Sequence, residues 1–229
     1  YLAMDVNTTG QNNVAVGYQA LDNNTVADLC TAVGYNALGA NTTQDDNTAV
    51  GSFCLSSNTT GGPNTAVGAK ALSTNSTGGA NTAIGYEALQ MNTTASYNTA
   101  VGQRALEECT TGTSNVAVGA LALDDLTTGA YSVAIGHKAL TAATTSMSNV
   151  AVGHEALLSC TTGQRNVAIG TNTGNAIVGG SDNTLLGRDA GLATSPSGAI
   201  VNGNHQVVLG DDDVTDLFCA DTSISSSDS

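Results

Sequence analysis

Tryptophan is absent from this chain of 229 residues, and aromatic side chains make up only 3% of it. Large aromatic side chains supply much of the buried area in ordinary globular cores, so this composition argues against a thick core of that kind. Long apolar runs are absent as well, whereas a helix that crosses a membrane needs about twenty consecutive apolar residues. The sequence therefore predicts a thin core and no membrane insertion.

Positive charge is equally scarce, with five lysine and arginine residues against nineteen aspartate and glutamate residues and a net charge of −14. Nucleic-acid binding is built from cationic contacts with phosphate, so this balance predicts no nucleic-acid partner. The chain also lacks a Ser-His-Asp arrangement, a phosphate loop and a pair of carboxylates that the periodicity would place across a cleft. We therefore expect no enzymatic activity and no cofactor.

Glycine returns every seventeen residues through most of the chain, at Gly17, Gly34, Gly51, Gly68, Gly85, Gly102, Gly119, Gly136, Gly153, Gly170 and Gly187. A fixed period of this length is the sequence signature of a solenoid, in which each repeat is one coil stacked on the last. Surface loops ordinarily accept insertions at small cost. The constant spacing therefore indicates that every loop is constrained by its neighbours.

One repeat reads Asn-Thr/Val-Ala-Val/Ile-Gly, two variable residues, Ala-Leu, two more variable residues, Asn-Thr-Thr-Gly and a short variable stretch. The β-branched residues favour strands, glycine permits a sharp bend, and Asn-Thr-Thr-Gly is turn chemistry. No window has helical spacing over the length that a helix needs. The prediction is an all-β fold, a β-solenoid of about eleven 17-residue coils, each containing strand, bend, strand and turn. At about 4.8 Å per stacked strand, the rod would be roughly 50 Å long.

Asparagine recurs at two positions of the repeat, both in or beside turns. Identical amides stacked coil on coil can hydrogen-bond along the rod and satisfy the turn backbone at the same time. We therefore interpret these asparagines as structural. The two columns are Asn41, Asn58, Asn75 and Asn92, and Asn47, Asn64, Asn81, Asn98, Asn115, Asn149 and Asn166.

Apolar residues occupy neighbouring positions in cycle after cycle, as in the stretch 82–84 and in Ala88-Leu89. Neighbours in an extended strand point to opposite faces, so one face fills the coil and the other faces outward. Because such a short coil encloses little volume, we favour burial of the outer face between chains, in a homotrimer around a threefold axis. The alternative is a monomeric solenoid with alanine outside.

Cysteine raises the question of disulfides or a metal site, and the repeat geometry argues against both. Cys109 and Cys160 share one repeat position three coils apart, about 14 Å, which exceeds disulfide reach. We interpret the cysteines as replacements at asparagine, alanine or other small-residue positions, with interchain pairing near a symmetry axis as the alternative. The five cysteines are Cys30, Cys54, Cys109, Cys160 and Cys219.

Two histidines, His137 and His154, hold the same repeat position in adjacent coils, where a zinc or nickel ion could bridge them. Coincidence at a variable position is the interpretation that we favour. The run Asp211-Asp212-Asp213 lacks the alternating ligand spacing of a calcium loop, so it is interpreted as a solvated acidic turn. The sequence therefore predicts no metal site.

The Asn-Thr/Val-Ala-Val/Ile-Gly element resembles the head repeats of trimeric autotransporter adhesins, which carry Asn-Ser-Val-Ala-Ile-Gly in a left-handed β-roll. The likeness covers roughly residues 1–190, and the period here is longer than in those heads. Similar Asn-Thr-Ala-Val-Gly arrays also look like segments of bacteriophage and marine virus tail-fibre proteins. The resemblance thus implies a viral tail fibre or, as the alternative, a bacterial adhesin head.

The end of the chain favours the viral interpretation. After Gly187 the pattern degrades, and the stretch 214–229 resembles the junction before the self-cleaving intramolecular chaperone of phage tail spikes and fibres. In that family a Ser-Asp-Ser type sequence adjoins the cleavage point, which implies that Ser229 is the processing end. The expected organisation is a solenoid shaft or head over residues 1–190 and a C-terminal cap and junction to a removed chaperone domain over residues 191–229.

The resulting hypothesis is an extracellular, structural and adhesive module of a virion. It would join other virion tail proteins and attach to a host cell-surface glycan or protein. Three chains would present equivalent weak sites and gain affinity through multivalency. The candidate receptor contacts are variable residues after the glycines, namely Tyr18, Tyr35, Phe53, Lys70, Tyr86, Arg104, His137 and His154. Tyrosines can stack on sugar rings, although the same residues also fit a plain solvated exterior.

Ice or mineral binding is a further class, suggested by paired threonines such as Thr93-Thr94. Adjacent threonines on a strand point in opposite directions, so only one ladder of hydroxyls could face a surface.

Overall fold

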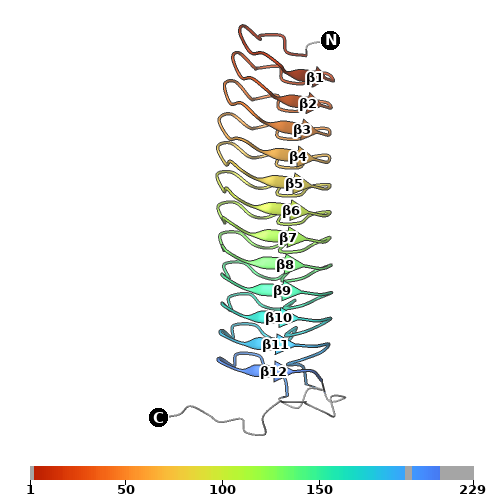
Figure 1. Ribbon diagram of the computed structural model, residues 1–229, viewed down its shortest axis with the longest axis vertical. Helices are drawn as coiled ribbons and strands as arrows, with labels where there is room; N and C mark the ends of the chain where they lie inside the picture. Colours follow the sequence, from red (N-terminus) through yellow and green to blue (C-terminus); the bar gives the residue numbers. More distant parts are fainter. Residues whose placement is uncertain (1–2, 194–197, 212–229) are drawn as a thin grey trace, which may run out of the picture.

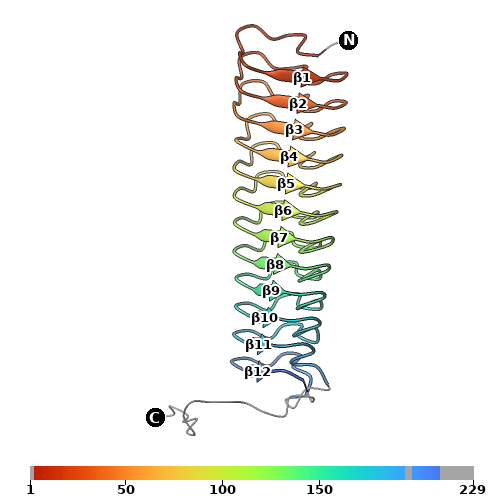
Figure 2. The same ribbon diagram turned by 45° about the vertical axis from the view of Figure 1, so that its right-hand side comes forward.

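The computed structural model describes residues 3–193 and 198–211, which wind into a straight rod (Figures 1 and 2). The described residues form β-strands joined by turns and contain no helix. The twelve strands form one parallel sheet in which each strand pairs with the next along the chain. The predicted all-β solenoid is therefore confirmed.

Each strand is three residues long. In chain order they are β1 (Val14–Val16), β2 (Thr31–Val33), β3 (Thr48–Val50), β4 (Thr65–Val67), β5 (Thr82–Ile84), β6 (Thr99–Val101), β7 (Val116–Val118), β8 (Val133–Ile135), β9 (Val150–Val152), β10 (Val167–Ile169), β11 (Thr184–Leu186) and β12 (Val207–Leu209).

The register of the sheet follows the sequence period. Residues seventeen apart pair from β1 through β11, as with Ala83 and Ala100. The step from β11 to β12 pairs Leu185 with Val208, so this last coil spans twenty-three residues. The sheet thus continues past residue 190, where the sequence suggested a boundary. The processing end predicted at Ser229 lies outside the described residues.

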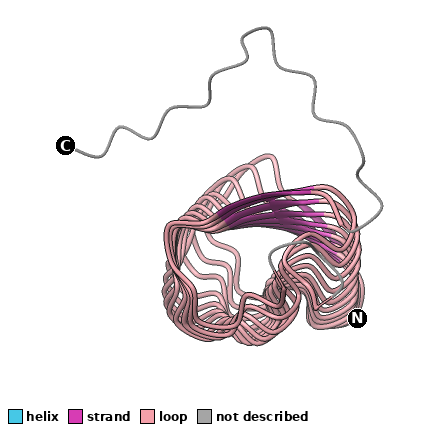
Figure 3. Ribbon diagram, turned by 90° about the horizontal axis from the view of Figure 1, so that it is seen from below, coloured by secondary structure: helices cyan, strands magenta, loops and turns pink. Residues whose placement is uncertain are grey.

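The three strand residues face in alternate directions. The middle residue, alanine in β1 to β10, points into the coil, and in β2 to β10 it is fully buried. The two flanking residues point outward from a single wall of the rod, which Figure 3 shows edge-on. The expectation of alanine on the outside is therefore wrong, because the pleat puts the larger strand residues there instead; the choice between a single chain and a trimer stays a prediction.

The second strand expected at Ala-Leu does not form. Ala88 and Leu89 lie in a turn and both are fully buried, although adjacent strand residues would point to opposite faces. The reason is that Leu89 adopts a left-handed conformation with φ of 51°, which breaks the alternation. Gly174 and Gly191 hold the equivalent position near the end of the rod, also with positive φ.

Leucine accepts this unfavourable backbone because of where it puts the side chain. The left-handed region costs an L-residue roughly 1–2 kcal/mol, whereas burying a leucine contributes about 1.5–3 kcal/mol. Burial outweighs the strain, and these leucines form the spine of the core. The fully buried members of the column are Leu21, Leu38, Leu55, Leu72, Leu89, Leu106, Leu123, Leu140 and Leu157.

The glycine that closes each strand is required by both conformation and space. Gly85 has φ of 142°, and a Cβ there would collide with the carbonyl oxygen of Gly102 in the next coil. The backbones of successive coils therefore touch directly at this corner. Side chains of other residues cannot be accommodated without separating the coils.

Replacing Gly85 by alanine should lower the free energy of unfolding by about 3 kcal/mol or more, through backbone strain and steric overlap. Thermal unfolding followed by circular dichroism measures the effect. Gly179→Ala is the matched control, because the atom nearest to its Cβ is the side-chain Oδ1 of Asn202 at 3.2 Å. Equal melting temperatures for the two variants would contradict the direct backbone contact.

The asparagine column before the strands is confirmed as structural. The side chain of Asn81 is buried; its Oδ1 accepts from the backbone N–H of Asn98 at 3.0 Å and its Nδ2 donates to the carbonyl of Ala95 at 2.9 Å. The column continues along the rod, and Cys30 and Ser132 replace asparagine within it. One amide thus satisfies two backbone groups of the next coil.

Asn81→Ala should destabilise the protein by about 2–5 kcal/mol, because it leaves a buried N–H and a buried C=O without partners. Asn81→Ser should cost less, since the natural Ser132 accepts the same backbone bond, from Asn149 at 3.3 Å. Urea unfolding curves of both variants test the ranking. A serine variant as unstable as the alanine variant would show that the hydroxyl cannot replace the amide oxygen.

The second asparagine column, in the Asn-Thr-Thr-Gly turn, also links coils through its side chains. Asn75 donates to Asn58 at 2.8 Å and Asn92 donates to Asn75 at 2.7 Å. Beyond Asn92 the same column becomes apolar, with Cys109, Leu126, Ala143, Cys160 and Ile177 all fully buried. The same repeat position is therefore stabilised by amide hydrogen bonds between coils in the first half of the rod and by apolar burial in the second half.

Candidate contact surfaces along the rod

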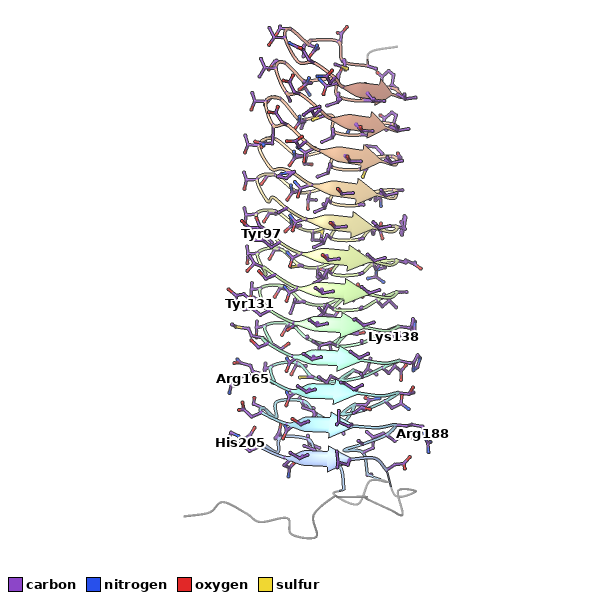
Figure 4. All side chains as sticks on the ribbon, in the orientation of Figure 1. Tyr97, Tyr131, Lys138, Arg165, Arg188 and His205 are labelled. Carbon is purple, nitrogen blue, oxygen red and sulfur yellow. The ribbon has the colours of Figure 1, made fainter. Side chains whose placement is uncertain are left out.

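The predicted contact residues lie on one long edge of the rod, where the chain leaves each strand. Each follows the glycine of its coil by one or two positions, and Lys138 and Arg188 mark this edge in Figure 4. The second of the two positions has positive φ, 57° at Phe53 and 60° at Lys70. The bend at glycine therefore turns these side chains away from the core.

Three aromatic side chains contact one another in the first coils and form an aromatic stack in which two rings are parallel and the third is edge-on. The rings of Tyr18 and Tyr35 are parallel within 13° with centroids 5.7 Å apart, and Phe53 meets Tyr35 edge-on at 4.9 Å. All three are exposed. These three coils thus place a row of exposed aromatic rings along the rod, with one ring in each coil.

The next two coils continue this edge with a charged pair beside a tyrosine. Lys70 Nζ lies 2.8 Å from Glu87 Oε1 and 5.9 Å from the centroid of the Tyr86 ring. The hydrogen bond with Lys70 lowers the pKa of Glu87, and the same bond raises the pKa of Lys70. Both groups are therefore charged at neutral pH, and they neutralise one another.

An open groove of about 330 Å³ begins where the aromatic stack ends. Its lining combines one aromatic ring, four hydroxyl side chains, one amide and one ammonium group, without a carboxylate. The lining residues are Phe53, Ser56, Ser57, Lys70, Ser73, Thr74 and Gln90. Two of the predicted contact residues, Phe53 and Lys70, therefore share one concave site.

Arg104, the next predicted contact residue, belongs to an acidic stretch of the same edge. It forms ion pairs with Glu107 and with Asp124, the latter at 3.5 Å. Asp124 is only 6% exposed, and its Oδ1 has no hydrogen-bond partner among the described residues. Burial therefore raises the pKa of Asp124 to about 6, and the nearby Arg104 opposes that rise only in part.

The raised pKa of Asp124 predicts a specific pH dependence. Between about pH 4 and pH 6 the folded chain retains a proton that the unfolded chain releases, so stability falls as the pH rises through this range. Asp124→Asn should remove this component and stabilise the protein by about 1–3 kcal/mol at pH 7, with little effect at pH 4.

Urea unfolding at pH 4 and pH 7 measures this difference. Asp125→Asn is the matched control, because Asp125 is the exposed neighbour on the same turn. A gain in stability at pH 7 that is equal for the two variants would contradict a burial effect specific to Asp124.

The two histidines do stack, as the sequence suggested. The ring centroids of His137 and His154 are 5.4 Å apart with planes 17° from parallel. Within the part of the chain that the structure describes, no group of three histidine, cysteine or acidic residues is placed to hold a metal ion. The pair adds a second stretch of flat rings to the same edge, farther along the rod.

The described cysteines, Cys30, Cys54, Cys109 and Cys160, are free thiols buried in the core. They occupy asparagine or alanine positions of the repeat, as expected. Burial raises the pKa of Cys54 to about 12 and that of Cys109 and Cys160 to about 11, so these thiols are not nucleophiles at neutral pH. Cys219 lies outside the described residues.

The opposite edge carries exposed residues that sequence reasoning missed. Tyr97 and Tyr131 are 70% and 62% exposed, and Figure 4 shows them on this edge with Arg165 and His205. All four stand five positions before a repeat glycine, and Arg165 binds Asp182 through two nitrogens at 2.6 and 2.8 Å. The sequence does carry a signal for this edge, because aromatic and charged residues alternate with small polar ones at this one repeat position from Tyr97 to Arg165.

The outer wall of the sheet is a third surface, and its strand residues carry no charge. Its first column is threonine or valine, and its second is valine, isoleucine or leucine in all twelve strands. Val67, Ile84, Ile135, Ile169 and Leu186 of the second column are among the exposed large hydrophobic residues. The wall is thus an uncharged strip, apolar along its second column and half threonine along its first.

The threonine pairs of the turn are partly used within the rod. Thr93 donates its hydroxyl to the carbonyl of Thr110 at 3.2 Å, and this pattern repeats in successive coils. The second threonine of each pair, such as Thr94, is exposed. One hydroxyl ladder therefore binds coil to coil and the other faces solvent.

These features define the chain as a parallel β-solenoid repeat protein. Among the described residues, no helix is long and apolar enough to cross a membrane. Comparison of the chain with protein families, curated proteins and solved structures gives no match.

Proposed function

We propose that this chain is a structural and adhesive fibre module, a shaft of a viral tail fibre that associates as a homotrimer and contacts the host surface. The observation that carries the proposal is the uncharged outer wall of a straight rod. A rod with one apolar strip can bundle in parallel with copies of itself and keep its polar edges in water. The repeat resemblance to tail-fibre arrays supports the viral setting.

The size of the wall supports burial between chains. Twelve strands of three residues give a strip of roughly 50 by 10 Å, or about 500 Å². The largest apolar patch on a monomer is typically about 300–600 Å² and often functional, so a strip of this size is a candidate interaction site. Absence of charged residues is also typical of interface centres. Threefold packing of such walls would place them around a common axis.

The register supports parallel, equivalent association. Because every coil presents the same three-residue strand, the wall of one chain offers a ladder of identical rows to its neighbour. A net charge of −14 on each chain opposes association, so assembly should strengthen as salt screens the repulsion. The edges, with their tyrosines and ion pairs, remain outside and repeat three times around the fibre, which provides multivalent contact with a host glycan or protein.

Lysine substitutions on the wall test this proposal. Analytical ultracentrifugation of the wild-type chain should give the mass of three chains. The double variant Val67→Lys, Val101→Lys should sediment as single chains, because each unpaired ammonium would be buried in the assembly. Its circular dichroism spectrum should still be that of a β protein, since both side chains already point outward.

The matched control is Thr60→Lys, Thr94→Lys, which adds the same charge at exposed turn positions of the same rod. It should remain trimeric. A wild-type chain that sediments as a monomer at micromolar concentration in 0.5 M salt, where the screening length is about 4 Å, would refute the association.

A further inference from the structure

Within the adhesive role, on which this inference rests, we propose that the groove between Phe53 and Lys70 binds one unit of an uncharged glycan. The aromatic stack of Tyr35 and Tyr18 then holds the following units, so that the glycan lies along the rod. The glycan would run parallel to the rod axis, from one coil to the next, and would not follow the chain within a single coil. Three observations carry this proposal: the exposed rings, the uncharged polar lining and the neutralised lysine.

The rings lie where a sugar can reach them. Phe53 is 41% exposed although it is one of only two phenylalanines in the chain, and it adopts positive φ where the coil before has Asn36. Positive φ recurs at this repeat position, as at Lys70 and Glu87, so the backbone of the coil itself turns the Phe53 side chain toward the outer edge. Carbohydrate rings bind such apolar faces through their C–H groups, which makes the exposed ring useful on the outside.

The lining of the groove suits hydroxyl-rich ligands. Ser56 Oγ donates to the carbonyl of Ser73 at 3.2 Å and Thr74 Oγ1 donates to the carbonyl of Gln90 at 2.6 Å. These bonds fix the hydroxyls and leave their lone pairs to accept from a ligand, while the Gln90 amide can both donate and accept. A volume of about 330 Å³ is at the low end for ligand sites, which suits a single sugar unit.

The charge of the site selects against acidic glycans. Lys70 is the one cation in the lining, and Glu87 neutralises it at 2.8 Å. Three coils farther on, the equivalents of Ser56 and Ser73 are acidic, at Glu107 and Asp124, and the whole chain is strongly acidic. A carboxylated or sulfated chain would be repelled, whereas an uncharged one would not.

The direction of the glycan follows from the stack. Tyr18, Tyr35 and Phe53 come from three successive coils, with ring separations of 5.7 and 4.9 Å that follow the coil spacing. Phe53 belongs to both the stack and the groove. A ligand seated in the groove and extended along the stack meets a new ring at each coil, so affinity should rise with chain length.

The test uses the full chain and isothermal titration calorimetry with defined oligosaccharides. The uncharged probes are the tetrasaccharides of maltose, cellulose, chitin and β-mannan type, and the acidic counterpart is tetragalacturonate. At least one uncharged probe should bind, more tightly than its own disaccharide, and tetragalacturonate should not. Phe53→Asn should weaken binding about tenfold or more. It preserves the backbone because Asn36 holds the equivalent position.

Tyr131→Asn is the matched control on the opposite edge, where Asn12 holds the equivalent position. It should leave binding unchanged. Tyr18→Ala, at a repeat position that holds Ala69 in another coil, should weaken binding of the tetrasaccharide and leave that of the disaccharide unchanged. The inference is overturned if no uncharged probe binds, if tetragalacturonate binds as tightly, or if Phe53→Asn and Tyr131→Asn have equal effects.

Sedimentation of the same samples separates this inference from the proposed function. Trimers that bind none of the uncharged probes would refute the groove and leave the shaft intact. Single chains that bind an uncharged glycan through Phe53 would support the groove and refute the trimeric shaft.

Discussion

Direct contact between the backbones of successive coils is the constraint on which the rest of this structure depends. At the corner after each strand, glycine lets the carbonyl of one coil approach the next more closely than any side chain would permit, as between Gly85 and Gly102. Because this contact recurs along the rod, a residue added to an inner coil would have to loop out without separating that coil from the neighbour on either side. The invariant 17-residue spacing has this physical origin, and the longer last coil occurs only where the stack ends.

Close stacking leaves little room inside, and the composition follows from that limit. The interior holds alanine from the strand, Ala-Leu from the turn, and columns of asparagine whose amides bind the backbone of the next coil. The core leucines adopt positive φ, and the burial of their side chains in one continuous apolar column outweighs that backbone strain. Polar columns and apolar columns thus stabilise one stack by different forces, hydrogen bonding in the first and burial in the second.

Side chains on the outer surfaces are not limited by the close stacking of the coils, and the proposed functions depend on these surfaces. The wall of the sheet is uniform because strand residues recur with the period, which makes it suited to contact with identical copies. The edges vary from coil to coil, and their tyrosines, histidines and ion pairs were partly predictable. The position after glycine was identified from its variability, but the more exposed Tyr97 and Tyr131 were missed, because their place on the opposite edge depends on how the turn folds.

The sequence by itself determined the solenoid, its period, its lack of helix and the structural role of asparagine, because each follows from spacing and local chemistry. The tertiary structure alone decided which side chains face out. Alternation along an extended strand correctly separates Ala83 from its neighbours, yet it fails at Ala88 and Leu89, where positive φ turns both inward. That conformation is unfavourable for an isolated leucine and is selected only by burial against the adjacent coils. The groove beside Phe53 likewise exists only once three coils are stacked, since its lining comes from residues 53–57, 70–74 and 90.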